Sequence, residues 1–126
     1  MKKDDSHKEK TLLEITGPAI DMQFGIARMN GSEAMAKEML KLMVKSLDTE
    51  LHHFQNAYDQ QDWEALKDLT HKLFGATCYC GTPRLKQACI NLEDYLQTSE
   101  TKQRGELYQQ LLEEIAILQT DYQALF

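Results

Sequence analysis

The spacing of apolar residues is the feature that most limits how this chain can fold. Over residues 33–58 apolar side chains recur every three or four positions, at Met35, Met39, Leu42, Met43, Leu47, Leu51, Phe54 and Tyr58. Because an α-helix has about 3.6 residues per turn, this spacing places them on one face of a helix. No stretch alternates apolar and polar residues as a half-buried strand does. The pattern therefore predicts an all-α protein.

Glycine, proline and capping residues divide the chain into five predicted helices, which cover residues 18–29, 33–58, 63–79, 83–96 and 102–124. Pro18 suits the first turn of the first helix. Ser32 is a good N-cap for the second helix, Gly81 ends the third, and Thr82 caps the fourth. In the first helix the residues expected to face inward are Ile20, Phe24 and Ala27.

Short connections between long amphipathic helices make successive helices antiparallel neighbours. We therefore predict an up-down antiparallel four-helix bundle over residues 18–126, with residues 18–29 as a short N-terminal helix that caps one end. Residues 1–17 are rich in charged residues and lack a periodic apolar pattern, which predicts a flexible tail or linker. If they form a linker, the chain is a piece of a larger protein.

The amino-acid composition argues against several classes of partner and location. The net charge of −6 and pI of about 5.1 argue against nucleic acid or an anionic membrane as the main partner. No apolar run approaches the roughly 20 residues that a membrane-spanning helix needs. The 3 cysteines follow no disulfide framework and are expected to be reduced thiols in the cytoplasm. A bundle that buries its own apolar faces is expected to be a monomer.

Residues 70–81 carry the strongest functional signal. The spacing predicts a buried stripe formed by Leu66, Leu69, Leu73, Ala76 and Cys80. His71 lies about 200° around the helix from Leu69 and Leu73 and therefore points outward. Gly75, one turn later on the same side, leaves the imidazole open although glycine within a helix costs about 1 kcal/mol. A surface histidine beside a helix-packing glycine is the alternative, and geometry alone does not choose between the two.

The segment resembles the signature of histidine phosphotransfer (Hpt) domains at His71, Leu73, Gly75 and Gly81. The flanking residues, including Leu92-Glu93, resemble the Hpt domains that end hybrid sensor kinases of the BarA/GacS type. The resemblance covers roughly residues 18–125. It implies a four-helix bundle and a location in the cytoplasm, tethered to the inner membrane where the domain is part of a sensor kinase.

This resemblance also implies a function. In Hpt domains a histidine accepts a phosphoryl group from an aspartyl phosphate of one receiver domain and passes it to an aspartate of a second. His71 would be the phospho-acceptor, and the partners would be the receiver of a hybrid kinase and a downstream response regulator. The receiver supplies Mg²⁺, so no cofactor of the chain's own is expected. The sequence contains no glycine-rich phosphate loop, so we do not expect phosphorylation from ATP.

The chain departs from the family at the third position after the histidine, where Phe74 replaces the usual lysine. We expect the phosphate or the receiver to be contacted instead by a dispersed set of residues, Lys67, Lys72, Phe74, Gly75, Cys78 and Lys86. Arg84 could also reach across from the next helix. The alternatives are a merely solvated lysine face and, for the function, a degenerate Hpt domain that docks receiver domains without covalent chemistry.

Residues near His71 suggest two other roles for this site. Asp68, one turn before His71, could orient the imidazole, but its i to i+4 spacing favours an ion pair with Lys72. A zinc site could combine His71 with Cys78, Cys80 and Cys89. Residues two apart on a helix point in nearly opposite directions, so Cys78 and Cys80 cannot face one metal. We therefore expect no metal site.

Overall fold

The computed structural model describes residues 14–126, so most of the predicted tail, residues 1–17, lies outside the described residues. All regular structure within the described range is helical: α2 (Met22–Arg28), α3 (Glu33–Asp59), α4 (Trp63–Cys80), α5 (Pro83–Leu96) and α6 (Arg104–Leu125). The all-α prediction is confirmed. None of these helices is both long and apolar enough to cross a membrane.

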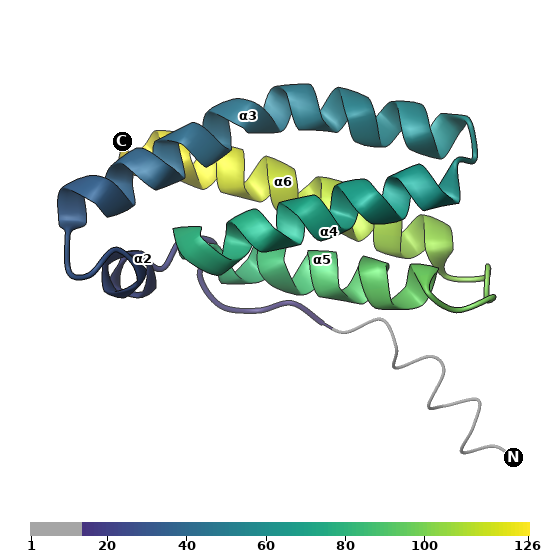
Figure 1. Ribbon diagram of the computed structural model, residues 1–126, viewed down its shortest axis with the longest axis horizontal. Coiled ribbons are helices and arrows are strands. Elements are labelled where there is room, and N and C mark those ends of the chain that lie inside the picture. Colours follow the sequence, from purple (N-terminus) through teal and green to yellow (C-terminus); the bar gives the residue numbers. More distant parts are fainter. Residues whose placement is uncertain (1–13) are drawn as a thin grey trace, which may run out of the picture.

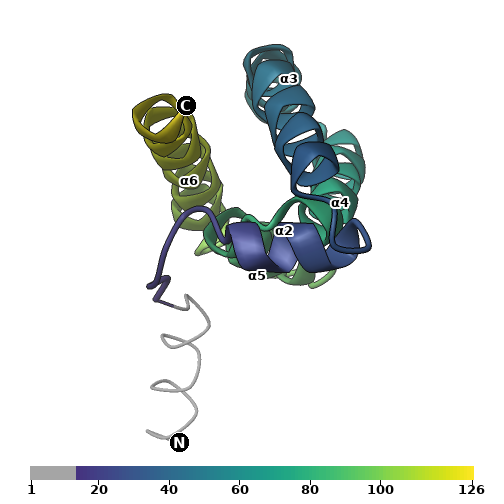
Figure 2. The ribbon, with the colours of Figure 1, turned by 90° about the vertical axis from the view of Figure 1, so that its left-hand side faces the viewer.

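The four long helices form an up-down bundle, and α2 crosses one end of it. In Figure 1 the axes of α3, α4, α5 and α6 run roughly side by side with alternating direction. Figure 2, which looks along the bundle, shows α2 lying across the ends of α4 and α5. The predicted bundle with a short N-terminal capping helix is therefore confirmed.

The core consists mainly of leucine side chains from all four long helices, together with Phe54 and Ile115. The predicted apolar face of α3 was partly wrong, because Met35 and Leu42 are 54% and 53% exposed. Leu42 lies about 200° around the helix from the fully buried Leu40, so the two cannot face the same neighbours. The face that meets the other helices contains Ala36 and Leu40 in their place.

The first helix begins later than predicted, at Met22, because Asp21 is its N-cap and accepts a hydrogen bond from the backbone N–H of Phe24 at 3.1 Å. The predicted inward side of this helix was also wrong. Phe24 and Ala27 are exposed, and the buried residue of α2 is Gly25. The reason is that α2 lies across the end of the bundle and presents its glycine to the other helices.

The joint between α4 and α5 holds α2 in place. Gly81 ends α4 in the left-handed conformation with φ of 65°, as predicted, and its carbonyl accepts a hydrogen bond from the backbone N–H of Asp21 at 2.8 Å. Pro83 occupies the first turn of α5. Thr82 is the N-cap residue by position, but its hydroxyl makes no capping hydrogen bond.

Candidate functional site

His71 lies in the middle of α4 on the side away from the core, and its side chain is 70% exposed. The buried residues of α4 are Leu66, Thr70, Leu73, Thr77 and Cys80. The predicted stripe was therefore wrong in detail, since Leu69 and Ala76 are only half-buried. Threonine was overlooked because it is polar, yet Thr70 and Thr77 hydroxyls donate to backbone carbonyls of their own helix at 2.7 and 2.6 Å. These hydrogen bonds remove the cost of burying them.

The imidazole is held by a carboxylate from the neighbouring helix. Nδ1 of His71 lies 2.7 Å from Oε2 of Glu93 on α5, and the Glu93 side chain is only 17% exposed. An ionised carboxylate can only accept hydrogen bonds, so this contact favours the tautomer that carries the ring proton on Nδ1. Nε2 is then the nitrogen with a free lone pair. The pair therefore fixes both the ring orientation and the atom that can act as a nucleophile.

Sequence reasoning missed the role of Glu93. It considered Asp68 as the acid that orients the imidazole, because Asp68 is one turn away on the same helix. In the structure the Asp68 side chain is exposed, and the carboxylate that contacts the imidazole belongs to Glu93, 22 residues from His71 in the sequence. Leu92-Glu93 was part of the recognised pattern, but only the register between α4 and α5 shows that this carboxylate reaches the ring.

The surface beside the imidazole is apolar and open. The ring centroid of Phe74 lies 6.3 Å from that of His71, and Phe74 is half-buried against the core. Gly75 is exposed, and a Cβ built on it would meet no atom within 4 Å. Cys78 continues this face two turns after His71 and is half-buried. The predicted apolar contacts Phe74, Gly75 and Cys78 therefore lie together along one side of α4.

The predicted cations do not gather at the imidazole. Lys67 forms an ion pair with Glu64 at 3.5 Å, and the Lys86 ammonium lies 6.0 Å from the centre of the Phe24 ring. Arg84, which was expected to be able to reach the site, makes a bidentate pair with the buried Glu114 at 2.8 Å. The predicted exposure of Lys72 agrees with the structure, but among the described residues it makes no ion pair with Asp68.

The cysteines are thiols placed for packing. Burial raises the pKa of the Cys80 and Cys89 thiols, which keeps them protonated and makes them poor metal ligands. Within residues 14–126 no group of three or more histidine, cysteine or acidic side chains is arranged to hold a metal ion.

An exposed histidine beside a glycine on a helical bundle matches what the sequence resemblance implied. Residues 38–124 match the family model of the Hpt domain. The chain belongs to the Hpt domain family. Hpt domains in two-component phosphorelays carry a phosphoryl group and interact with receiver domains, so the predicted function is confirmed at the level of the family.

Relatives of this Hpt domain include parts of two sensor kinases. The chain is 35% identical over 92 residues to the sensor protein GacS of Pseudomonas syringae pv. syringae. It is 32% identical over 94 residues to the signal transduction histidine-protein kinase BarA of Escherichia coli strain K12. These matches cover 71% and 75% of this chain but only 10% of either kinase.

Solved structures support the same assignment. The HPT domain of a sensor hybrid histidine kinase from Shewanella superimposes with a TM-score of 0.77 at 26% identity, over 85% of this chain and 92% of that one. The histidine-containing phosphotransfer protein B (HptB) of Pseudomonas aeruginosa PAO1 gives a TM-score of 0.73 at 21% identity, over 86% and 95% of the two chains, and shows that the fold is shared.

Because Gly75 lies in open space, replacing it with alanine should have opposite effects on stability and on phosphoryl transfer. Since an added Cβ meets no atom within 4 Å, Gly75→Ala should raise the free energy of unfolding by about 0.5–1 kcal/mol, the helix-propensity difference between the two residues. The same methyl group lies beside His71 and should slow phosphoryl transfer. Urea denaturation and a transfer assay would measure both. A variant that is less stable than the wild type would contradict this account of the glycine.

Proposed function

We propose that Nε2 of His71 accepts a phosphoryl group from the aspartyl phosphate of one receiver domain and passes it to the aspartate of a second. The observation that carries this proposal is the exposed imidazole whose Nδ1 is held by Glu93 at 2.7 Å. Histidine is nucleophilic at neutral pH and can hold a covalent intermediate. The bundle fixes the nucleophile and leaves the space in front of it to the partner.

The transfer balances without a further reactant. The Nε2 lone pair forms a bond to phosphorus, the bond between phosphorus and the aspartate oxygen breaks, and its electron pair returns to the donor carboxylate. The Nδ1 proton stays in the hydrogen bond with Glu93 throughout, so the positive charge on the phosphorylated ring is balanced by a carboxylate. In the second transfer these bond changes run in reverse, onto the acceptor aspartate.

We further propose that the domain works with the receivers of a hybrid sensor kinase and a response regulator on the cytoplasmic side of the membrane, as a monomer. Similarity to segments of GacS and BarA supports this placement. The chain would use no cofactor of its own, because the Mg²⁺ that assists the transfer would be bound by the receiver.

The test is phosphoryl transfer from a phosphorylated receiver domain to the purified full chain. We expect a label that is lost in acid and kept in alkali, as a phosphohistidine is, and mass spectrometry should locate it on the peptide that contains His71. If a panel of receivers leaves the chain unlabelled while one of them binds it, the chain is a docking module without covalent chemistry.

Glu93 is a positioning residue, and its replacement should slow the transfer while leaving the bundle folded. In Glu93→Ala the imidazole loses the hydrogen bond that holds Nδ1 and favours one tautomer. We expect the transfer rate to fall 10- to 100-fold, because misplacing a reacting group has an effect of this size. Glu93→Gln, which can still accept a hydrogen bond from Nδ1, should recover part of the rate. Glu113→Gln, at an exposed glutamate on α6, is the matched control. Equal rates for Glu93→Ala and the wild type would remove Glu93 from the mechanism.

A further inference from the structure

Two aromatic rings and two cations meet where α2 crosses the end of the bundle. The guanidinium carbon of Arg28 lies 5.6 Å from the centre of the Phe24 ring and 5.8 Å from that of Tyr79, and the Lys86 ammonium lies 6.0 Å from Phe24. These four residues, which come from α2, α4 and α5, are called the basic–aromatic cluster below. Its rings are not core residues, since Phe24 is 38% and Tyr79 is 52% exposed.

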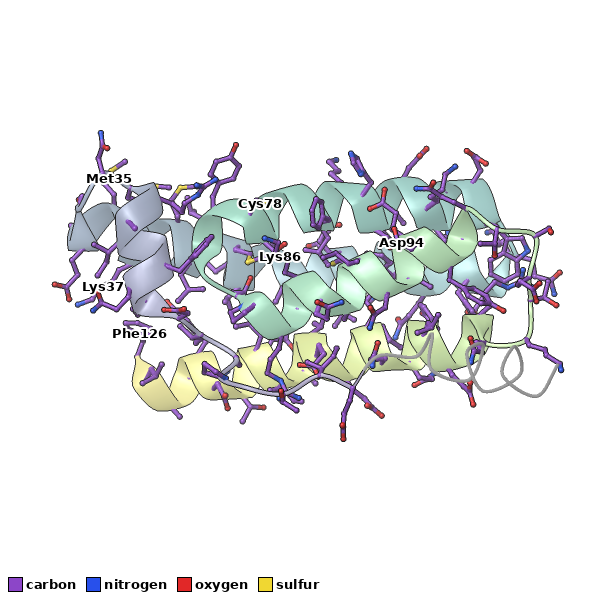
Figure 3. All side chains as sticks on the ribbon, turned by 90° about the horizontal axis from the view of Figure 1, so that it is seen from below. Met35, Lys37, Cys78, Lys86, Asp94 and Phe126 are labelled. Atoms are coloured by element: carbon purple, nitrogen blue, oxygen red, sulfur yellow. The ribbon has the colours of Figure 1, made fainter. Side chains whose placement is uncertain are left out.

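The cluster extends the same face that carries His71. Cys78 follows His71 by two helical turns on α4, and Lys86 precedes Glu93 by two turns on α5. Since Glu93 contacts His71, the two antiparallel helices bring Cys78 and Lys86 to neighbouring positions, as Figure 3 shows. Two turns of helix span about 11 Å. The cluster therefore begins about that distance from the imidazole.

The charges along this face differ on the two sides of His71. Arg28 and Lys86 lie toward α2, although the chain as a whole has a net charge of −6. In the other direction Asp68 on α4 and Asp94 on α5 are exposed, and Figure 3 shows Asp94 well away from Lys86. Lys67 on that side is paired with Glu64, and Lys72 is exposed next to His71. A partner that covers the whole face would therefore meet positive charge on the α2 side of the histidine and charge of both signs on the other side.

A small hollow lies within the cluster and contains an unused polar group. Its volume is about 80 Å³, and Phe24, Lys86 and Thr82 are among the residues that line it. Thr82 is 1% exposed, and its hydroxyl oxygen has no hydrogen-bond partner among residues 14–126. A buried hydroxyl is normally paired, so the floor of the hollow holds one unsatisfied polar group within the described residues.

We propose that the basic–aromatic cluster is a second contact for the receiver domain that docks on His71, and that it favours receivers with an acidic patch beside their phosphorylated aspartate. This inference rests on the proposed function. An aspartyl phosphate site with bound Mg²⁺ requires further carboxylates, so its surroundings are acidic and complement Arg28 and Lys86.

A protein interface of ordinary size is large enough to include both His71 and the basic–aromatic cluster. A standard interface buries about 800 Å² on each partner, which corresponds to a disc of about 16 Å radius. A receiver centred on His71 would therefore reach the cluster without any rearrangement of the bundle. The charge difference along the face would then fix the orientation of the docked receiver.

The experiment compares charge reversals at the two ends of the molecule. Full-length wild type, Arg28→Glu, Lys86→Glu and the double variant are titrated with receiver domains that label the wild type, and Kd and the transfer rate are measured at low and high salt. Lys102→Glu, an exposed residue in the connection before α6 at the far end of the bundle, is the matched control. Circular dichroism confirms that each variant is folded.

We expect the double variant to raise Kd at least tenfold at low salt, with a smaller effect at high salt, while the transfer rate at saturating receiver stays within twofold of the wild type. A shift in Kd no larger than that of Lys102→Glu would overturn the inference and leave the proposed function intact. If no receiver labels the wild type, the proposed function fails and this inference fails with it.

Discussion

Replacing His71 with glutamine should abolish phosphoryl transfer to this protein. The amide of glutamine has a similar size and can still hydrogen-bond to Glu93, but it has no nucleophilic nitrogen lone pair. The side chain is 70% exposed and belongs to no part of the core, so the free energy of unfolding should change by less than about 0.5 kcal/mol. We expect labelling from a phosphorylated receiver to fall below detection, at least 1,000-fold below the wild type on the scale of lost nucleophiles.

Two other histidines serve as controls for this result. His52 and His53 are exposed on α3, a different helix from the one that carries His71. His52→Gln and His53→Gln should therefore accept label at the wild-type rate. A His71→Gln variant that still receives an acid-labile label would show that the acceptor is another residue, and a loss of labelling in His52→Gln would point to α3.

Most of the fold was predictable because it depends on local patterns. Within residues 14–126 the helices have the predicted order, which follows from apolar spacing and from helix-ending residues such as Gly31 and Gly81. The orientation of His71 also followed from its own helix. The errors concern which of two apolar faces is buried, as at Met35 and Leu42, because periodicity alone does not say where the neighbouring helix lies.

The rest of the site depends on contacts between helices that no local pattern contains. Glu93 reaches His71 only because α4 and α5 pack in one particular register. Arg28 and Tyr79 meet only because of the side that α2 turns toward the bundle, and the prediction of a capping helix had that side wrong. The pairing of Arg84 was hidden for the same reason, since its buried carboxylate partner Glu114 lies on α6 and sequence spacing could not reveal it.

Substitution of Gly81, at the joint between α4 and α5, should strongly reduce the stability of the protein. A Cβ on this residue would fall on the backbone carbonyl oxygen of Asp21, and its φ of 65° is unfavourable for any residue with a side chain. The clash involves backbone rather than a flexible side chain, so α2 must move to relieve it. We expect Gly81→Ala to lower the free energy of unfolding by roughly 2–5 kcal/mol. The left-handed conformation contributes about 1–2 kcal/mol of this loss and the overpacking about 1–3 kcal/mol.

Gly31→Ala separates these two costs. Gly31 has φ of 85°, yet a Cβ there would meet no atom within 4 Å, so only the conformational cost applies. Urea denaturation of both variants should therefore show a smaller loss for Gly31→Ala, and equal losses would mean that α2 is not held against Gly81. Because Asp21 leads directly into α2, a folded Gly81→Ala variant should also displace Phe24 and Arg28. It should then bind receivers more weakly, although His71 and Glu93 are unchanged.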